Sequence, residues 1–201
     1  MSKKEILPGI HTVSSLLRWQ PHRAQSIWLE QNKNNARIEQ LVGHAQKLGI
    51  SVQQVQRAKL DQLCEGTQHQ GIAASCSPTP MVDEQELVDQ IASASTAPLI
   101  LILDEVSDPH NFGACLRTAD AAGVDAVVVP QRNSAPLSPT VHKIASGATL
   151  RLKITKTTNL ARFIDAIKKS GVWVYGAAGE ATNSIYQSNL SQATAIVMGA
   201  E

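Results

Sequence analysis

The first 76 residues alternate between helical and strand periods of hydrophobic positions. Between residues 38 and 48, apolar side chains recur at the spacing of one helix face, and Gly49 follows as a helix stop. The predicted buried faces are Ile38, Leu41, Val42, Ala45 and Leu48 on this helix, and Val13, Leu16 and Leu17 on a second helix near residues 11–19. Short strands are predicted at 26–29, 51–55 and 71–75. The pattern indicates a small α/β/α domain over residues 1–76.

Composition changes after this domain. Prolines and a Ser/Ala/Thr-rich stretch at 92–96 flank an acidic segment at 83–89. We therefore predict a linker over residues 77–97, in which the acidic segment forms one or two helical turns.

From residue 98 onward, strand and helix patterns alternate. Residues 99–103 are apolar at every position, which is typical of a parallel strand covered on both faces. Further strands are predicted at 126–129, 152–154, 172–175 and 195–198, with helices near 111–122, 140–147 and 158–169. This alternation predicts an α/β domain over residues 98–201 with a doubly wound parallel sheet, whose ligand sites lie at the carboxyl ends of the strands.

Composition excludes several classes of protein. No apolar run approaches the roughly 20 residues needed to cross a bilayer, and no signal-peptide core follows the N-terminus, so we expect a cytoplasmic protein without membrane association. The three cysteines lack C-x-x-C spacing and the six histidines lack helical metal-site spacing. We expect reduced thiols and no metal.

Charge is distributed unevenly. Residues 1–80 hold nine Lys and Arg against five Asp and Glu, a net charge of +4, whereas the remainder holds nine against twelve, a net charge of −3. The basic surplus is compatible with a phosphate-backbone partner, although many domains of this charge bind no nucleic acid.

Glycine-rich phosphate loops of the G-x-G-x-x-G and G-x-x-x-x-G-K-[ST] types do not occur in the sequence. Instead, residues 104–123 place polar groups after the first strand of the predicted sheet and then begin a helix. Asn111 is predicted at or next to the N-cap, and Arg117 is positioned to pair with Asp120 one turn on. These residues alone fit a stabilised helix start as well as a functional site.

The string D-P-H-N-F-G-A-C-L-R-T-A-D-A-A-G at 108–123 resembles the first signature motif of SpoU/TrmH-type RNA ribose methyltransferases of the SPOUT superfamily. The resemblance continues at 146–148, 159–160, 176–180 and 197–201. Segments 9–13 and 69–72 resemble the substrate-binding domain of family members that methylate a guanosine ribose in bacterial 23S rRNA.

This resemblance implies an N-terminal RNA-binding domain and a parallel-sheet catalytic domain with an α/β knot. It also implies S-adenosyl-L-methionine as cofactor, structured RNA, above all 23S rRNA, as substrate, and a homodimer. The implied catalytic residues are Asn111, Arg117 and Glu201, and the implied cofactor-binding residues are Gly176, Ala177, Gly199 and Ala200. Ala177 departs from the family, which often has threonine there.

The sequence stops at Glu201, before the rest of the second motif and the whole third motif of the family. We therefore expect the knot to remain open in this chain, with weak or absent cofactor binding and no activity.

The implied reaction is an in-line methyl transfer to a ribose 2′-hydroxyl, in which positioning dominates. A guanidinium is a poor base, so we expect Arg117 to clamp the target phosphate or ribose, with direct removal of the proton by Arg117 as the alternative. Asn111 would orient Arg117 or the hydroxyl, and Glu201 would hold Arg117. Two alternatives remain open, a transfer-RNA ribose 2′-O-methyltransferase and a non-catalytic RNA-binding fragment.

Overall fold

The computed structural model describes residues 4–33 and 35–199, which form two compact units. One unit contains the chain up to Thr79 together with Phe112–Arg117 and Pro136–Arg151; the other contains Pro80–Asn111, Thr118–Ala135 and the residues from Leu152 onward. Within the described ranges, no helix is long and apolar enough to span a bilayer.

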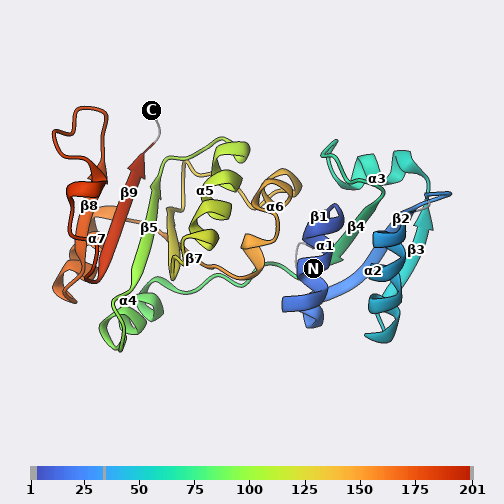
Figure 1. Cartoon of the computed structure of the whole chain (residues 1–201), viewed down its shortest axis with the longest axis horizontal. Coiled ribbons are helices and arrows are strands. Elements are labelled where there is room, and N and C mark those ends of the chain that lie inside the picture. The colour runs from blue at the N-terminus through green and yellow to red at the C-terminus, as the bar shows by residue number, and fades with distance from the viewer. Residues whose placement is uncertain (1–3, 34, 200–201) are drawn as a thin grey trace. The chain divides into compact units, whose positions relative to one another are not determined.

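The first unit is built on a four-stranded sheet of order β1-β4-β2-β3 (Figure 1). Strand β4 is antiparallel to both of its neighbours, and β2 is parallel to β3. The strands are β1 (Glu5–Pro8), β2 (Ala24–Glu30), β3 (Ser51–Val55) and β4 (Ile72–Cys76), and the helices are α1 (Ile10–Trp19), α2 (Ala36–Lys47) and α3 (Arg57–Leu63). The predicted helices and strands of this region are confirmed, whereas β1 and α3 were not predicted.

The core of this sheet contains most of the predicted apolar positions. Val13, Leu16 and Leu17 of α1 are buried, as are Ile38 and Ala45 of α2. Leu48 is 43% exposed, so its predicted burial is wrong. The physical reason is that α2 ends at Lys47, and the C-cap residue no longer follows the helical stripe.

The second unit is built on a five-stranded sheet of order β7-β6-β5-β9-β8, in which every neighbouring pair is parallel. The strands are β5 (Leu99–Asp104), β6 (Ala126–Pro130), β7 (Lys153–Thr157), β8 (Trp173–Ala177) and β9 (Thr194–Gly199). The predicted parallel α/β sheet is thus confirmed. Because all strands run the same way, their carboxyl ends lie along one edge.

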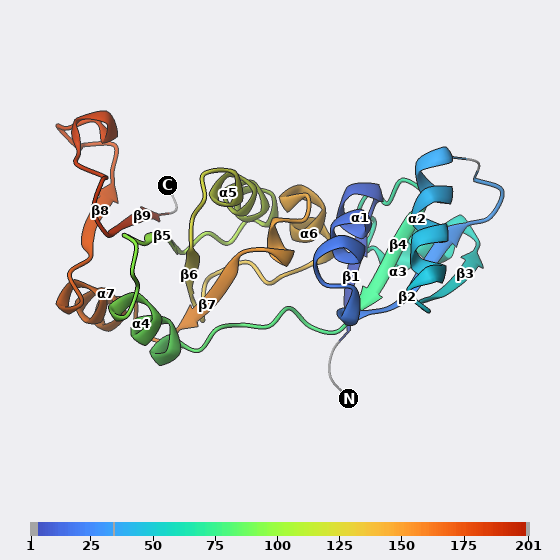
Figure 2. The same cartoon turned by 60° about the horizontal axis from the view of Figure 1, so that its bottom comes forward.

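One face of this sheet is covered by α4 (Glu84–Ala92) and α7 (Leu160–Lys169), which lie side by side (Figure 2). Their apolar stripes pack on Ile100 and Ile102 of β5. The stripes consist of Leu87 and Ile91 on α4 and of Phe163 and Ile167 on α7. The predicted linker therefore contains a helix, α4, that packs on the sheet. Its apolar stripe was not recognised in the sequence because the segment is rich in acidic residues.

Two further helices are α5 (Pro109–Ala121) and α6 (Pro139–Ala145). Helix α5 follows β5 along the chain. Its residues Phe112, Leu116 and Ala119 are buried.

A buried polar cluster in the first unit joins β1, the 3₁₀ turn before β2 and α6. Arg23 Nη2 lies 3.1 Å from Glu5 Oε2, and the Thr79 hydroxyl donates to the same oxygen at 2.7 Å. His142 Nε2 lies 3.5 Å from Glu5 Oε2, while its Nδ1 is 2.9 Å from the Thr149 hydroxyl. Burial by itself raises the pKa of Glu5, but the contacts from His142 and Thr79 outweigh it and leave that pKa below its ordinary value.

Candidate active site

The order of the second sheet reverses between β5 and β9. From β5 the chain proceeds outward through β6 and β7, then crosses to β8 at the opposite edge and returns to β9. Ligands of open α/β sheets bind at the carboxyl ends of the strands beside such a reversal. Asp104 of β5 pairs there with Gly199 of β9, and Ala177 of β8 pairs with Met198.

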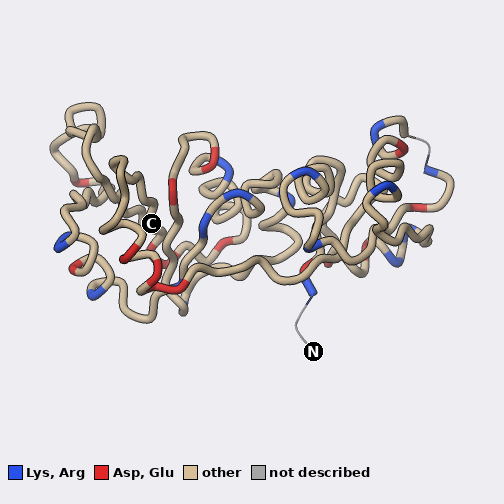
Figure 3. Tube along the Cα trace, turned by 90° about the horizontal axis from the view of Figure 1, so that it is seen from below, with Lys and Arg blue, Asp and Glu red and all other residues tan. Residues whose placement is uncertain are grey.

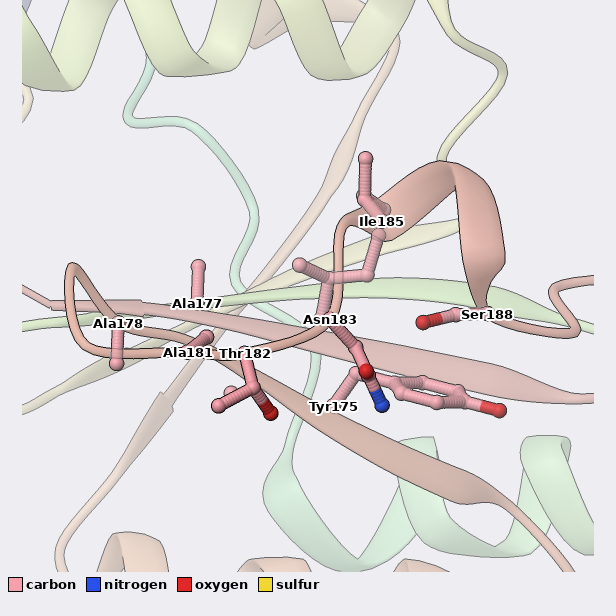
Figure 4. A pocket seen from close by; sticks show the side chains of 10 residues that line it. Tyr175, Ala177, Ala178, Ala181, Thr182, Asn183, Ile185 and Ser188 are labelled. Carbon is pink, nitrogen blue, oxygen red and sulfur yellow. The ribbon is translucent and has the colours of Figure 1, made fainter.

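A pocket of about 470 Å³ lies over β8 and β9 at this edge (Figure 4). Its volume is in the range of small-molecule sites. The lining combines small, apolar and uncharged polar side chains: Tyr175, Gly176, Ala177, Ala178, Ala181, Thr182, Asn183, Ile185, Ser188 and Ile196. The structure therefore places the sequence-predicted residues Gly176 and Ala177 in its wall.

Three glycines at this edge have no structural reason to be glycine. Gly176, Gly179 and Gly199 have ordinary φ values, and a Cβ added to any of them meets no heavy atom within 4 Å beyond its chain neighbours. Gly113 differs, because its Cβ would lie 2.7 Å from Ile144 Cβ. Open space over uncrowded glycines lets a bound molecule approach the backbone closely.

Helix α5 begins beside the same edge, after the carboxyl end of β5. Its N-cap is Asp108, whose Oδ1 accepts a hydrogen bond from the Asn111 backbone at 2.8 Å. The prediction that Asn111 caps the helix is therefore wrong, because the chain turns into the helix three residues earlier, before Pro109. The Asn111 side chain is exposed and has no hydrogen bond to the described residues.

Arg117 is exposed on α5, and its guanidinium has no ion pair within 4–33 and 35–199. The expected pairing with Asp120 is thus absent. Arg117 lies six positions after Asn111 on the helix, a rotation of about 600°, which is about 120° short of two full turns, so the two side chains leave different faces of the helix. Neither residue lines the pocket. Ala200 and Glu201, the remaining predicted site residues, lie outside the described residues.

Comparison with known proteins adds to this geometry. Residues 98–201 match the family model described as the SpoU rRNA Methylase family, and residues 6–82 match the model for RNA 2'-O ribose methyltransferase substrate binding. The chain belongs to the SpoU rRNA methylase family. Among curated SpoU relatives, the 23S rRNA (guanosine-2'-O-)-methyltransferase RlmB of Vibrio cholerae is 45% identical over 98% of this chain and 79% of that protein. The protein of the same name from Pseudomonas syringae pv. tomato is 44% identical over 100% and 80%.

Solved structures share the fold of this SpoU family chain. A crystal structure of an RNA 2'-O ribose methyltransferase aligns with a TM-score of 0.81 at 23% identity, covering 100% of this chain and 72% of the other. The SpoU methyltransferase AviRb from Streptomyces viridochromogenes, solved with AdoMet, aligns with a TM-score of 0.73 at 16% identity, covering 98% and 74%.

The SpoU motifs did not indicate most of the pocket. Tyr175, Asn183, Ile185 and Ser188 come from β8 or the loop after it, and sequence reasoning assigned none of them. The available signal was the run of small and polar residues that follows a predicted strand end. Lys and Arg of the N-terminal half are spread over several elements rather than gathered in one run (Figure 3), so charge pattern alone could not define an RNA surface.

Proposed function

We propose that this SpoU family member transfers a methyl group from S-adenosyl-L-methionine to the 2′-oxygen of a guanosine ribose in 23S rRNA. The proposal is supported by relatives of that name that are 43–45% identical over 98–100% of the chain. The structural observation that carries it is the pocket over Gly176, at the edge where parallel α/β sheets bind their ligands.

The residues present fit this cofactor. Tyr175, Ile185 and Ile196 offer aromatic and apolar surface to an adenine ring, while Thr182 and Asn183 offer hydroxyl and amide groups to polar atoms. No cationic side chain is among the ten lining residues, so none would repel a sulfonium. When bound, S-adenosylmethionine supplies an electrophilic methyl group.

The remaining chemistry falls to groups that hold the RNA. The guanidinium of Arg117 can clamp a phosphate or ribose by charge-assisted hydrogen bonds and lower the pKa of the attacking hydroxyl electrostatically. The amide of Asn111 is available to orient that hydroxyl. Because the two leave different faces of α5, Asn111 acts on the substrate rather than on Arg117. Glu201 stays a predicted partner of Arg117.

Our proposal for the whole assembly follows the resemblance in the sequence. The domain of residues 1–76 would hold structured RNA, and the domain of residues 98–201 would carry the catalytic site. The linker of residues 77–97 would connect these two domains. A homodimer with a knotted C-terminal region, working in the cytoplasm, is the proposed functional state. Light scattering of the purified protein measures its mass, and a strictly monomeric mass would contradict the dimer.

The test of activity uses a protein that also carries the family's complete second and third motifs, and it measures transfer of a labelled methyl group to protein-free 23S rRNA, with transfer RNA as a parallel substrate and nucleotide mapping of the product. We expect labelling of a guanosine ribose in 23S rRNA, whereas labelling confined to transfer RNA would favour the alternative substrate. Arg117→Lys should lose most turnover, because an ammonium cannot reproduce the planar fork. Arg162→Lys, at an exposed arginine of α7 that does not line the pocket, should retain it. Equal activity of the two variants would remove Arg117 from the mechanism.

The non-catalytic alternative is separated by calorimetry. Titration with S-adenosylmethionine up to millimolar concentration should give measurable heat if the pocket is a cofactor site. RNA binding without any cofactor binding would favour a bare RNA-binding module.

A further inference from the structure

The outer wall of the pocket is the loop of residues 178–193, which joins β8 to β9. Six of the ten lining residues belong to it: Ala178, Ala181, Thr182, Asn183, Ile185 and Ser188. The pocket therefore keeps its shape only while this 178–193 loop keeps its place against the strands.

The 178–193 loop organises itself through local side-chain bonds. Ser184 and Gln187 form a capping box around the 3₁₀ turn Ile185–Gln187, in which the Ser184 backbone donates to Gln187 Oε1 at 2.8 Å. Asn189 Oδ1 accepts from the Ser191 backbone at 3.1 Å. These bonds set the internal shape of the loop, but they do not attach it to the sheet.

Apolar packing attaches the loop at Ala193, next to β9, but not along residues 178–191. Its large apolar side chains face solvent, with Ile185 49%, Leu190 38% and Tyr186 95% exposed. A loop segment without buried apolar contacts lies at the low end of local stability. Its position then depends on whatever polar contacts reach the strands.

At the β9 end, the Trp173 N–H donates to the Ala193 carbonyl and the Thr194 hydroxyl donates to the Gln192 carbonyl, both at 2.8 Å, so residues 192–193 are attached to the strands. In the pocket-lining part of the loop, residues 178–191, one such contact exists. The hydroxyl of Tyr175, on β8, donates to the Asn189 carbonyl at 3.0 Å. Within residues 35–199, it is the one hydrogen bond that joins residues 178–191 to a strand. Figure 4 shows the Tyr175 ring lying along the pocket, with the hydroxyl at the end away from Ala178.

We propose that Tyr175 is a positioning residue for the cofactor pocket, whose hydroxyl holds the 178–193 loop where it forms the pocket wall. This inference rests on the proposed function for the identity of the ligand. Loss of the hydroxyl should shift the loop towards open states and weaken S-adenosylmethionine binding. The net effect of one hydrogen bond corresponds to a change of roughly two- to tenfold. The methyl-transfer step itself should not change.

The test compares Tyr175→Phe with Tyr186→Phe, a matched control in the same loop whose ring is almost fully exposed. Both variants keep the ring and should fold. Hydrogen–deuterium exchange of the 178–193 peptides should be roughly two- to tenfold faster in Tyr175→Phe alone. The dissociation constant for S-adenosylmethionine, or its KM where turnover is measured, should rise by a similar factor at unchanged kcat.

Equal exchange in the two variants would overturn the proposal, and so would faster exchange with unaltered cofactor affinity or a fall in kcat alone. If the unsubstituted protein binds no S-adenosylmethionine, the proposed function of the pocket fails instead. The exchange comparison still decides in that case whether Tyr175 holds the loop.

Discussion

Gly147 offers a quantitative test of the packing in the first unit. It follows α6 in a left-handed conformation, with φ +93. A Cβ at this position would lie 2.6 Å from Ser15 Cβ and would also overlap Ser15 Oγ. Carbon atoms do not approach so closely, so Gly147→Ala requires the segment after α6 and helix α1 to move apart.

Two costs add in this variant. An alanine in a left-handed conformation costs about 1–2 kcal/mol, and overpacking of a closed contact costs about 1–3 kcal/mol. Gly147→Ala should therefore lower the free energy of unfolding by about 2–5 kcal/mol. Gly49→Ala is the control, because Gly49 belongs to the same unit, has φ +72 and has nothing within 4 Å of its added Cβ. It should show the first cost alone.

Urea unfolding followed by circular dichroism and tryptophan fluorescence measures both variants. The second substitution Ser15→Gly removes both clashing atoms, and it should recover part of the Gly147→Ala loss despite its own cost in a helix. The coupling between the two sites isolates the steric part. If Gly147→Ala and Gly49→Ala destabilise equally, or if Ser15→Gly adds its full cost to Gly147→Ala, the argument from close contact is refuted.

Three further outcomes are expected. Asp108→Ala should lower the free energy of unfolding by about 1 kcal/mol, because it removes the N-cap of α5. Asn111→Ala should change the free energy of unfolding by no more than about 0.5 kcal/mol, and a larger effect of Asn111→Ala than of Asp108→Ala would contradict the cap assignment. The folded pKa of Glu5 lies below its ordinary value of 4.5, so its carboxylate stabilises the fold above that pH, and this contribution is lost as the pH falls through the folded pKa. Glu5→Gln should therefore reduce the decrease in unfolding free energy that urea titrations measure as the pH is lowered. An unaltered decrease would contradict this. Burial raises the pKa of the Cys64 thiol to about 12 and also raises the pKa of the half-buried Cys115 thiol. A thiol reagent near neutral pH should therefore modify Cys115 slowly and Cys64 only when the protein unfolds. Modification of Cys64 before unfolding would contradict the burial argument.

The sequence by itself determined the parallel sheet of the second unit and most of its helices. Residues 99–103 are apolar at every position because the strand is buried on both faces, and the stripe containing Phe163 and Ile167 repeats at the helical period because one face of α7 packs on that sheet. These signals are local, so they can be read from the sequence without knowing which elements the strand or the helix packs against. The motif at 108–123 likewise indicated the family, because the resemblance lies in consecutive residues.

Tertiary structure decided what local signals could not. The acidic residues of α4 made its segment look like a linker, although Leu87 and Ile91 are buried. Their burial depends on a sheet whose strands come later in the sequence. Gly147 and Gly176 look alike in the sequence, yet one is crowded by Ser15 and the other faces open space. The pocket likewise depends on the pairing of β8 with β9, because its walls are these two strands and the loop that joins them. Contacts between residues distant in sequence carry these differences, and they exist only once the chain has packed.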